Sequence, residues 1–116
     1  MDKKTYFEKQ RNRYKKGELA WCAKMARKWH EEECSHILRI ADEAVRLEFL
    51  FDLSWDMERT YKKETFAYPI CWTYMPAEDE EFVYQMNRHR YFICLGQAYA
   101  MTGDEKYAEA FVQITK

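Results

Sequence analysis

Residues 79–115 read DEEFVYQMNRHRYFICLGQAYAMTGDEKYAEAFVQIT, and this stretch decides the expected fold. Helical periodicity extends from Asp79 to about Met101, and Gly103 supplies the left-handed conformation that commonly ends a helix. Asp104 then stands where a capping residue starts a last helix. Two antiparallel helices joined by such a short turn form a helical hairpin. The stretch therefore predicts an all-α fold built of antiparallel helical hairpins.

A run of four polar residues interrupts the apolar pattern of this helix, namely Asn87, Arg88, His89 and Arg90. After them the helix is apolar on nearly every side, which is typical of a helix buried between neighbours. Four consecutive positions point in all directions around a helix, so some of these side chains must face inward. An inward-facing charge needs a partner or a wet cavity. Two interpretations stay open: pairing with acidic residues such as Glu64 or Glu78, or a groove that holds an anionic ligand.

The first part of the chain also shows helical patterns. Residues 1–33 are expected to form basic N-terminal helices, and the first of these should end at Gly17, which suits a C-terminal cap position. Residues 34–47 repeat apolar side chains at helical spacing and predict a further helix. Whether residues 33–35 separate two helices or lie within one stays open.

The middle of the chain departs from the helical pattern. Residues 48–78 begin with an extended segment near 49–55, where aromatic and aliphatic residues alternate with a period of two. An irregular loop rich in aromatic residues follows over 61–77, and its aromatic content favours an ordered loop packed on the domain. With the hairpin at 79–116, we interpret the whole chain as one helical domain or fragment.

The charge is small overall but unevenly distributed. The chain has 116 residues, about the size of one domain, and a net charge of −1, so nothing global indicates a nucleic-acid partner. Residues 1–28 nevertheless hold ten Lys and Arg residues against Asp2, Glu8 and Glu18, a net of +7. Such a segment either contacts a polyanion or forms a solvated face balanced by the acidic remainder.

The cysteines do not indicate a metal site. Cys22, Cys34, Cys71 and Cys94 lack zinc-ligand spacing. His30 and Cys34 lie one helical turn apart, but the segment does not follow the His-Glu-x-x-His pattern. We therefore expect neither a metal nor another cofactor.

The hydropathy of the chain bears on membrane association and on the cellular compartment. No apolar run approaches the roughly 20 residues of a membrane span, so we expect no membrane partner. The N-terminal residues lack the hydrophobic core of a signal peptide, which favours a cytoplasmic protein.

Five short motifs, in order, resemble the N-terminal region of the heparinase II/III family of polysaccharide lyases. These motifs are Trp72, Asp79-Glu80, Asn87-Arg88-His89, Leu-Gly-Gln-Ala-Tyr at 95–99 and Thr-Gly-Asp-Glu-Lys-Tyr-Ala at 102–108. The segment 49–59 is also similar to the piece that precedes them there, and the resemblance covers roughly residues 37–112. It implies that the hairpins form part of an incomplete α/α toroid, which in the family precedes a β-sandwich.

The resemblance also implies a function. The family cleaves acidic polysaccharides by β-elimination, and its catalytic residues are expected beyond residue 116. The chain would then contribute to the cleft that binds an acidic oligo- or polysaccharide containing uronic acid, sulfated or not. Asn87, Arg88, His89 and Trp72 are its candidate substrate-binding residues. Arg90 is an electrostatic neighbour, because arginine pairs well with carboxylate and sulfate.

A tetratricopeptide-like interaction module is the alternative. One unit of that helical repeat matches Phe92, Leu95, Gly96, Tyr99, Gly103, Ala108 and Val112. A second copy is missing before it, since residues 58–78 hold two prolines and no helical pattern. We also expect exposed apolar faces to promote self-association of the isolated chain.

Overall fold

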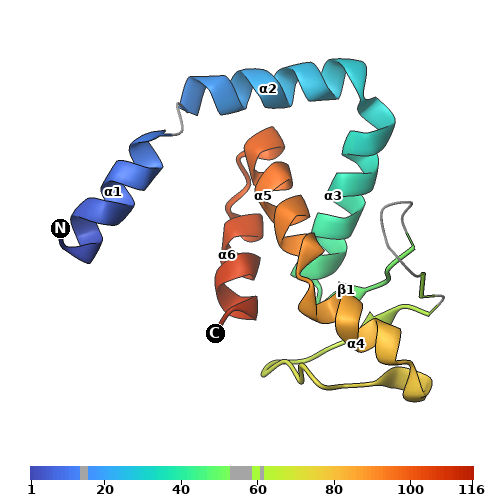
Figure 1. Ribbon diagram of the computed structural model, residues 1–116. Coiled ribbons are helices and arrows are strands. Elements are labelled where there is room, and N and C mark those ends of the chain that lie inside the picture. The colour runs from blue at the N-terminus through green and yellow to red at the C-terminus, as the bar shows by residue number, and fades with distance from the viewer. Residues whose placement is uncertain (14–15, 53–58, 61) are drawn as a thin grey trace.

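The computed structural model describes residues 1–13, 16–52, 59–60 and 62–116 (Figure 1). The helices are α1 (Lys3–Arg13), α2 (Lys16–Trp29), α3 (Glu31–Val45), α4 (Glu80–Asn87), α5 (Arg90–Thr102) and α6 (Glu105–Ile114). Two short strands, β1 (Glu48–Phe49) and β2 (Glu64–Thr65), pair antiparallel with Glu48 opposite Thr65, and the 3-10 turn η1 (Pro76–Glu78) precedes α4. Apart from this ribbon, the described chain is all-α, which confirms the predicted fold class.

Three helices form the core. The most extensive helix packing joins α3 to α5, and α6 turns back against both (Figure 1). Ala41 of α3 and Ala98 of α5 are completely buried, and Leu95 is nearly so. Small side chains at these positions let the helix backbones approach closely, so that larger neighbours fill the remaining space.

Aromatic rings connect the helices to the segment between β1 and α4. Phe66 stacks parallel to Phe82 of α4 at 6.2 Å between ring centroids, and Phe49 of β1 lies 4.8 Å from Tyr91 of α5. The Tyr91 hydroxyl donates to the Met86 carbonyl at 3.2 Å, and burial raises the pKa of Tyr91 well above its usual range. The loop is thus held by buried rings, as its aromatic composition predicted.

A buried carboxylate ties the same loop to α3. Glu43 is 6% exposed and accepts hydrogen bonds from Lys63 at 2.8 Å and from Arg39 at 3.3 Å. Two cationic partners compensate for the desolvation of this charge. Arg39 also bonds Asp52 at 3.1 Å, so one set of ion pairs spans α3 and both ends of the loop that follows β1.

A second polar link joins α6 to α3. The Tyr107 hydroxyl donates to Asp42 Oδ1 at 2.8 Å, and Lys106 Nζ lies 2.9 Å from the same oxygen. Burial acts to raise the pKa of Asp42, but the hydrogen bonds from Lys106 and Tyr107 outweigh it and hold that pKa below its ordinary value. The ionised carboxylate therefore stabilises the packing of α6.

The hairpin ends as predicted, but the long helix before it is broken. Gly103 adopts φ 69°, and Asp104 caps α6 by accepting from the Lys106 amide at 3.0 Å. The expected helix from Asp79 to Met101 is instead α4 and α5, because His89 adopts the left-handed conformation with φ 55°. A helix cannot continue through that backbone conformation.

Three boundaries in the first half also differ. Gly17 lies inside α2 and does not end the first helix, since glycine is tolerated in the opening turn of a helix. Residues 33–35, whose place was left open, lie within α3; the break between α2 and α3 is at His30, so the helix predicted over 34–47 begins at Glu31. Of the extended segment near 49–55, Phe49 is in a strand, whereas residues 53–55 lie outside the described residues.

The N-terminal helices expose large apolar side chains. Trp21 and Trp29 of α2 are 63% and 68% exposed, and self-association through such residues stays a prediction. None of the helices in the described ranges is long and apolar enough to cross a bilayer.

We expect Tyr107→Phe to lower the free energy of unfolding by about 1 kcal/mol at neutral pH, because it removes a partly buried hydrogen bond to a carboxylate. The folded-state pKa of Asp42 is depressed, so this contribution is complete above the ordinary value of 3.8 and disappears as the pH falls through the lower folded-state value. Urea unfolding followed by circular dichroism at neutral and acidic pH measures both effects.

Tyr99→Phe is the matched control, because its hydroxyl bonds Glu105 on the exposed surface at 2.8 Å. A loss for Tyr107→Phe no larger than that of the control, or one that persists unchanged in acid, would contradict the role of Asp42.

Candidate functional site

The polar run 87–90 forms a turn between two helices. His89 occupies the left-handed region at φ 55° and ψ 28°, which is uncommon for residues other than glycine but is several-fold enriched for histidine. Its half-buried ring stacks on Phe92 at 5.0 Å between centroids and meets the edge of Trp72 at 5.3 Å. These ring contacts offset the strain of the turn, which is of the order of 1–2 kcal/mol.

Asn87 fixes the loop beside the turn. Its Nδ2 atom donates to the Trp72 carbonyl at 2.9 Å and to the Val83 carbonyl at 2.8 Å. The first bond spans fifteen positions of sequence and joins the loop to the end of α4. Asn87 therefore positions Trp72, and its amide nitrogen is already engaged within the protein.

The two arginines of the polar run make their contacts away from Trp72. Arg88 Nη1 forms an ion pair with Glu81 Oε1 at 2.7 Å along α4, and not with Glu64 or Glu78 as the first interpretation proposed. Arg90 lines a separate hollow of about 490 Å³ with Ile37 and Gln97. The structure thus brings together Trp72, Asn87 and His89, whereas Arg88 pairs with Glu81 and Arg90 lines another hollow.

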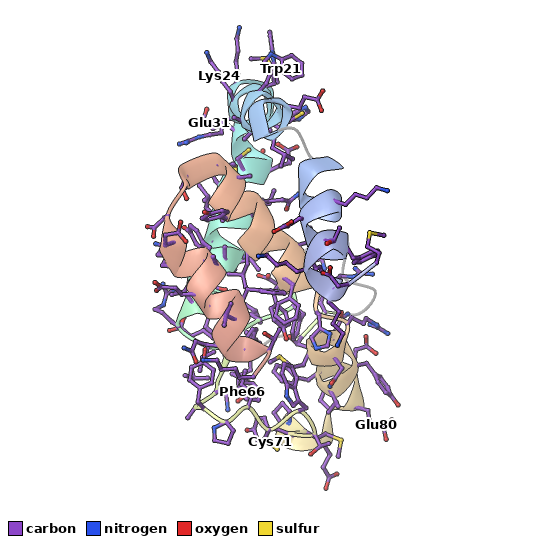
Figure 2. The ribbon with its side chains drawn as sticks, turned by 90° about the vertical axis from the view of Figure 1, so that its left-hand side faces the viewer. Trp21, Lys24, Glu31, Phe66, Cys71 and Glu80 are labelled. Atoms are coloured by element: carbon purple, nitrogen blue, oxygen red, sulfur yellow. The ribbon has the colours of Figure 1, made fainter. Side chains whose placement is uncertain are left out.

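Trp72 also lines a second hollow, where the loop meets the end of α6. It measures about 510 Å³, and the residues that line it include Tyr68, Ile70, Trp72, Gln113, Ile114 and Lys116. The loop residues Tyr68 and Ile70 lie between Phe66 and Cys71 in the sequence, and Figure 2 shows these two labelled residues below the end of α6.

Sequence reasoning found only Trp72 among these lining residues. Tyr68 and Lys116 are separated by most of the second half of the chain, and no spacing rule connects them. The aromatic content of residues 61–77 could have identified Tyr68 as a candidate binding residue. Gln113 and Lys116 line the hollow only because α6 folds back on α5. Hydrophobic periodicity predicts which face of a single helix is buried, but it does not predict which loop packs against the end of that helix.

The earlier metal candidates are not assembled into a cluster. Cys34 is buried, while His30 and His36 are exposed. No three His, Cys, Asp or Glu side chains gather as a ligand set among the residues that the structure describes. The chemistry available at Trp72 is therefore that of aromatic faces, amides and one ammonium group, which suits binding of a polar ligand.

Comparisons with known proteins place the chain in a family. The family model described as Heparinase II/III N-terminus matches residues 4–116. A heparin-sulfate lyase of Bacteroides stercoris is 36% identical over 70 residues, which are 60% of this chain and 10% of that protein. A heparin-sulfate lyase of Bacteroides thetaiotaomicron is 38% identical over 48 residues, 40% of this chain and 7% of that protein.

The matched segments thus span a tenth or less of each of these relatives. No solved structure matches the chain. Because the family model extends over nearly every residue, the chain belongs to the Heparinase II/III N-terminus family.

Proposed function

We propose that this chain is the N-terminal part of a longer polysaccharide lyase that cleaves uronic-acid-containing polysaccharides of the heparan sulfate kind. The observation that carries the proposal is the family match over residues 4–116. The two relatives named heparin-sulfate lyase support the substrate class. The reaction is a β-elimination, in which a base removes the C5 proton of a uronate and the C4 glycosidic oxygen departs.

Such a reaction requires both substrate binding and proton transfer, and different parts of the protein can perform them. Negative charge develops on the uronate carboxylate in the transition state, so hydrogen-bond donors must neutralise it while a base and an acid move protons. We assign the proton-transfer groups to residues outside 1–116. Residues 1–116 bind and orient the polymer.

The edge formed by Trp72 and His89 is the binding surface that we propose within the chain. The His89 ring is held in place by Phe92 and Trp72 through its carbon framework. An N–H group of this ring is the group that would donate to a sugar hydroxyl or carboxylate. Asn87 contributes by fixing Trp72, whereas the charge of Arg88 is already paired with Glu81 along α4.

The tetratricopeptide-like alternative stays a prediction without a supporting observation. The hairpin of α5 and α6 has the required shape, but a repeat array needs at least about three stacked units. The described residues between 59 and 79 form β2, a loop and η1 in place of a preceding helical pair of that period.

Replacing His89 tests the cleft in the full-length protein that carries this chain. We choose His89→Asn, because asparagine also tolerates the left-handed conformation and should preserve the turn. Loss of a hydrogen bond to an anionic sugar should lower kcat/KM by roughly tenfold or more. Ultraviolet absorbance of the unsaturated uronate product measures the rate on heparan sulfate.

His36→Asn, on the exposed face of α3, is the matched control and should leave the rate unchanged. Equal rates for His89→Asn and the wild-type protein would remove His89 from the cleft. Absence of any unsaturated product from uronic-acid polymers would refute the lyase assignment itself.

Asn87 should act on the loop rather than on the sugar. Asn87→Ala removes the bonds to the Trp72 and Val83 carbonyls and should cost about 1 kcal/mol of unfolding free energy. Hydrogen exchange should accelerate in residues 66–75, and KM should rise more than kcat falls. Gln97→Ala, which removes an exposed amide of α5, is the control. Unaltered exchange in the loop would show that Asn87 does not position it.

A further inference from the structure

A third hollow lies where α2 meets the end of α5. It measures about 580 Å³, and its lining includes Ala20, Ala23, Lys24 and Arg27 of α2 together with Met101 and Gly103 at the end of α5. The four residues of α2 recur at helical spacing and therefore share one face of that helix. The two alanines have no side chain beyond Cβ, so they leave room on this face beside the two positive charges.

Arg27 is held at this hollow by the end of α5. Its Nη1 atom donates to the Met101 carbonyl at 3.2 Å, across 74 positions of sequence. The last carbonyls of a helix lack partners within that helix, and the guanidinium group offsets their partial negative charge. A guanidinium group has five N–H donors, so this bond fixes Arg27 and leaves donors for a ligand.

Lys24 is the second cation of the hollow. It is exposed, and no Asp or Glu side chain in the part of the chain that the structure describes forms an ion pair with its ammonium group. The carboxylate of Asp104, next to Gly103 in sequence, instead caps α6 by accepting from the Lys106 amide at 3.0 Å. Because the α5 carbonyls already balance part of the Arg27 charge, Lys24 leaves the hollow with a net positive charge.

The charge of the surrounding helices favours an anionic ligand over a longer range. Residues 1–28 carry a net charge of +7. The acidic residues that follow, at 31–33, stand in the first turn of α3, where the positive end of the helix dipole offsets their charge. A basic surface of this kind attracts a polyanion before contact is made.

We propose that this hollow is a remote anion site, at which Lys24 and Arg27 bind a carboxylate or sulfate group of the polysaccharide. Charge-assisted hydrogen bonds from a guanidinium or ammonium group are the strong contacts available to such anions. Figure 2 shows Lys24 at the end of the molecule opposite Cys71, which adjoins Trp72 in sequence. A short oligosaccharide bound at Trp72 therefore does not reach Lys24, whereas a long polymer contacts both. The inference rests on the proposed function, because it concerns the same polymer.

Lys24→Gln in the full-length protein tests the remote anion site. The dissociation constant for long heparan sulfate, measured by isothermal titration calorimetry at low salt, should rise about twofold to fivefold, because one exposed charge contact is lost. The difference should shrink at high salt. Turnover of a tetrasaccharide, which occupies only the Trp72 surface, should stay unchanged. Lys24→Arg should restore polymer binding because it keeps the charge.

Lys62→Gln is the matched control, because the Lys62 side chain is 87% exposed and its loss changes the net charge equally. Polymer binding by Lys24→Gln that is no weaker than binding by Lys62→Gln would overturn the remote anion site. An equal loss of turnover on polymer and tetrasaccharide would also overturn it, since Lys24 would then act at the Trp72 surface. Absence of unsaturated product from both substrates would instead refute the lyase function, while weaker polymer binding by Lys24→Gln would still support the anion site.

Discussion

The left-handed backbone at His89 divides one apolar stretch into α4 and α5, and much of the fold depends on this change of direction. A straight helix would carry Phe82 and Met86 away from the core, whereas the turn folds α4 beneath the ends of α3 and α5. Both side chains are 1% exposed as a result. The turn is costly for a residue with a side chain, and the His89 ring compensates by stacking on Phe92 and by an edge contact with Trp72.

The same turn creates the surface that we assign to sugar binding. The turn ends α4 at Asn87, and the side-chain amide of Asn87 donates to the Trp72 carbonyl. Trp72 contacts His89 and also lines the hollow at the end of α6. A structural requirement and a functional surface thus share the same few residues, which is why the two interpretations of the polar run do not exclude each other.

The sequence predicted the structure well where a feature depends on one residue and its neighbours in the chain. Asp79, Gly103 and Asp104 act at helix ends through their own backbone and side-chain preferences, and all three do so in the structure. It was misleading at His89, because the residues after the polar run are apolar on nearly every side of the helix and so hide the change of direction, and because the left-handed residue is not glycine. The assembly of Tyr68 with Lys116 was not predictable, since it depends on how α6 packs and not on any spacing.

The central claim is that Trp72 lies at the point where the polymer meets this chain. A structure of the full-length protein with a bound uronic-acid oligosaccharide tests it most directly. We predict sugar rings in van der Waals contact with Trp72, with a polar group of the sugar near His89. An oligosaccharide bound at full occupancy with no atom near residues 68–72 or 87–90 would contradict the account.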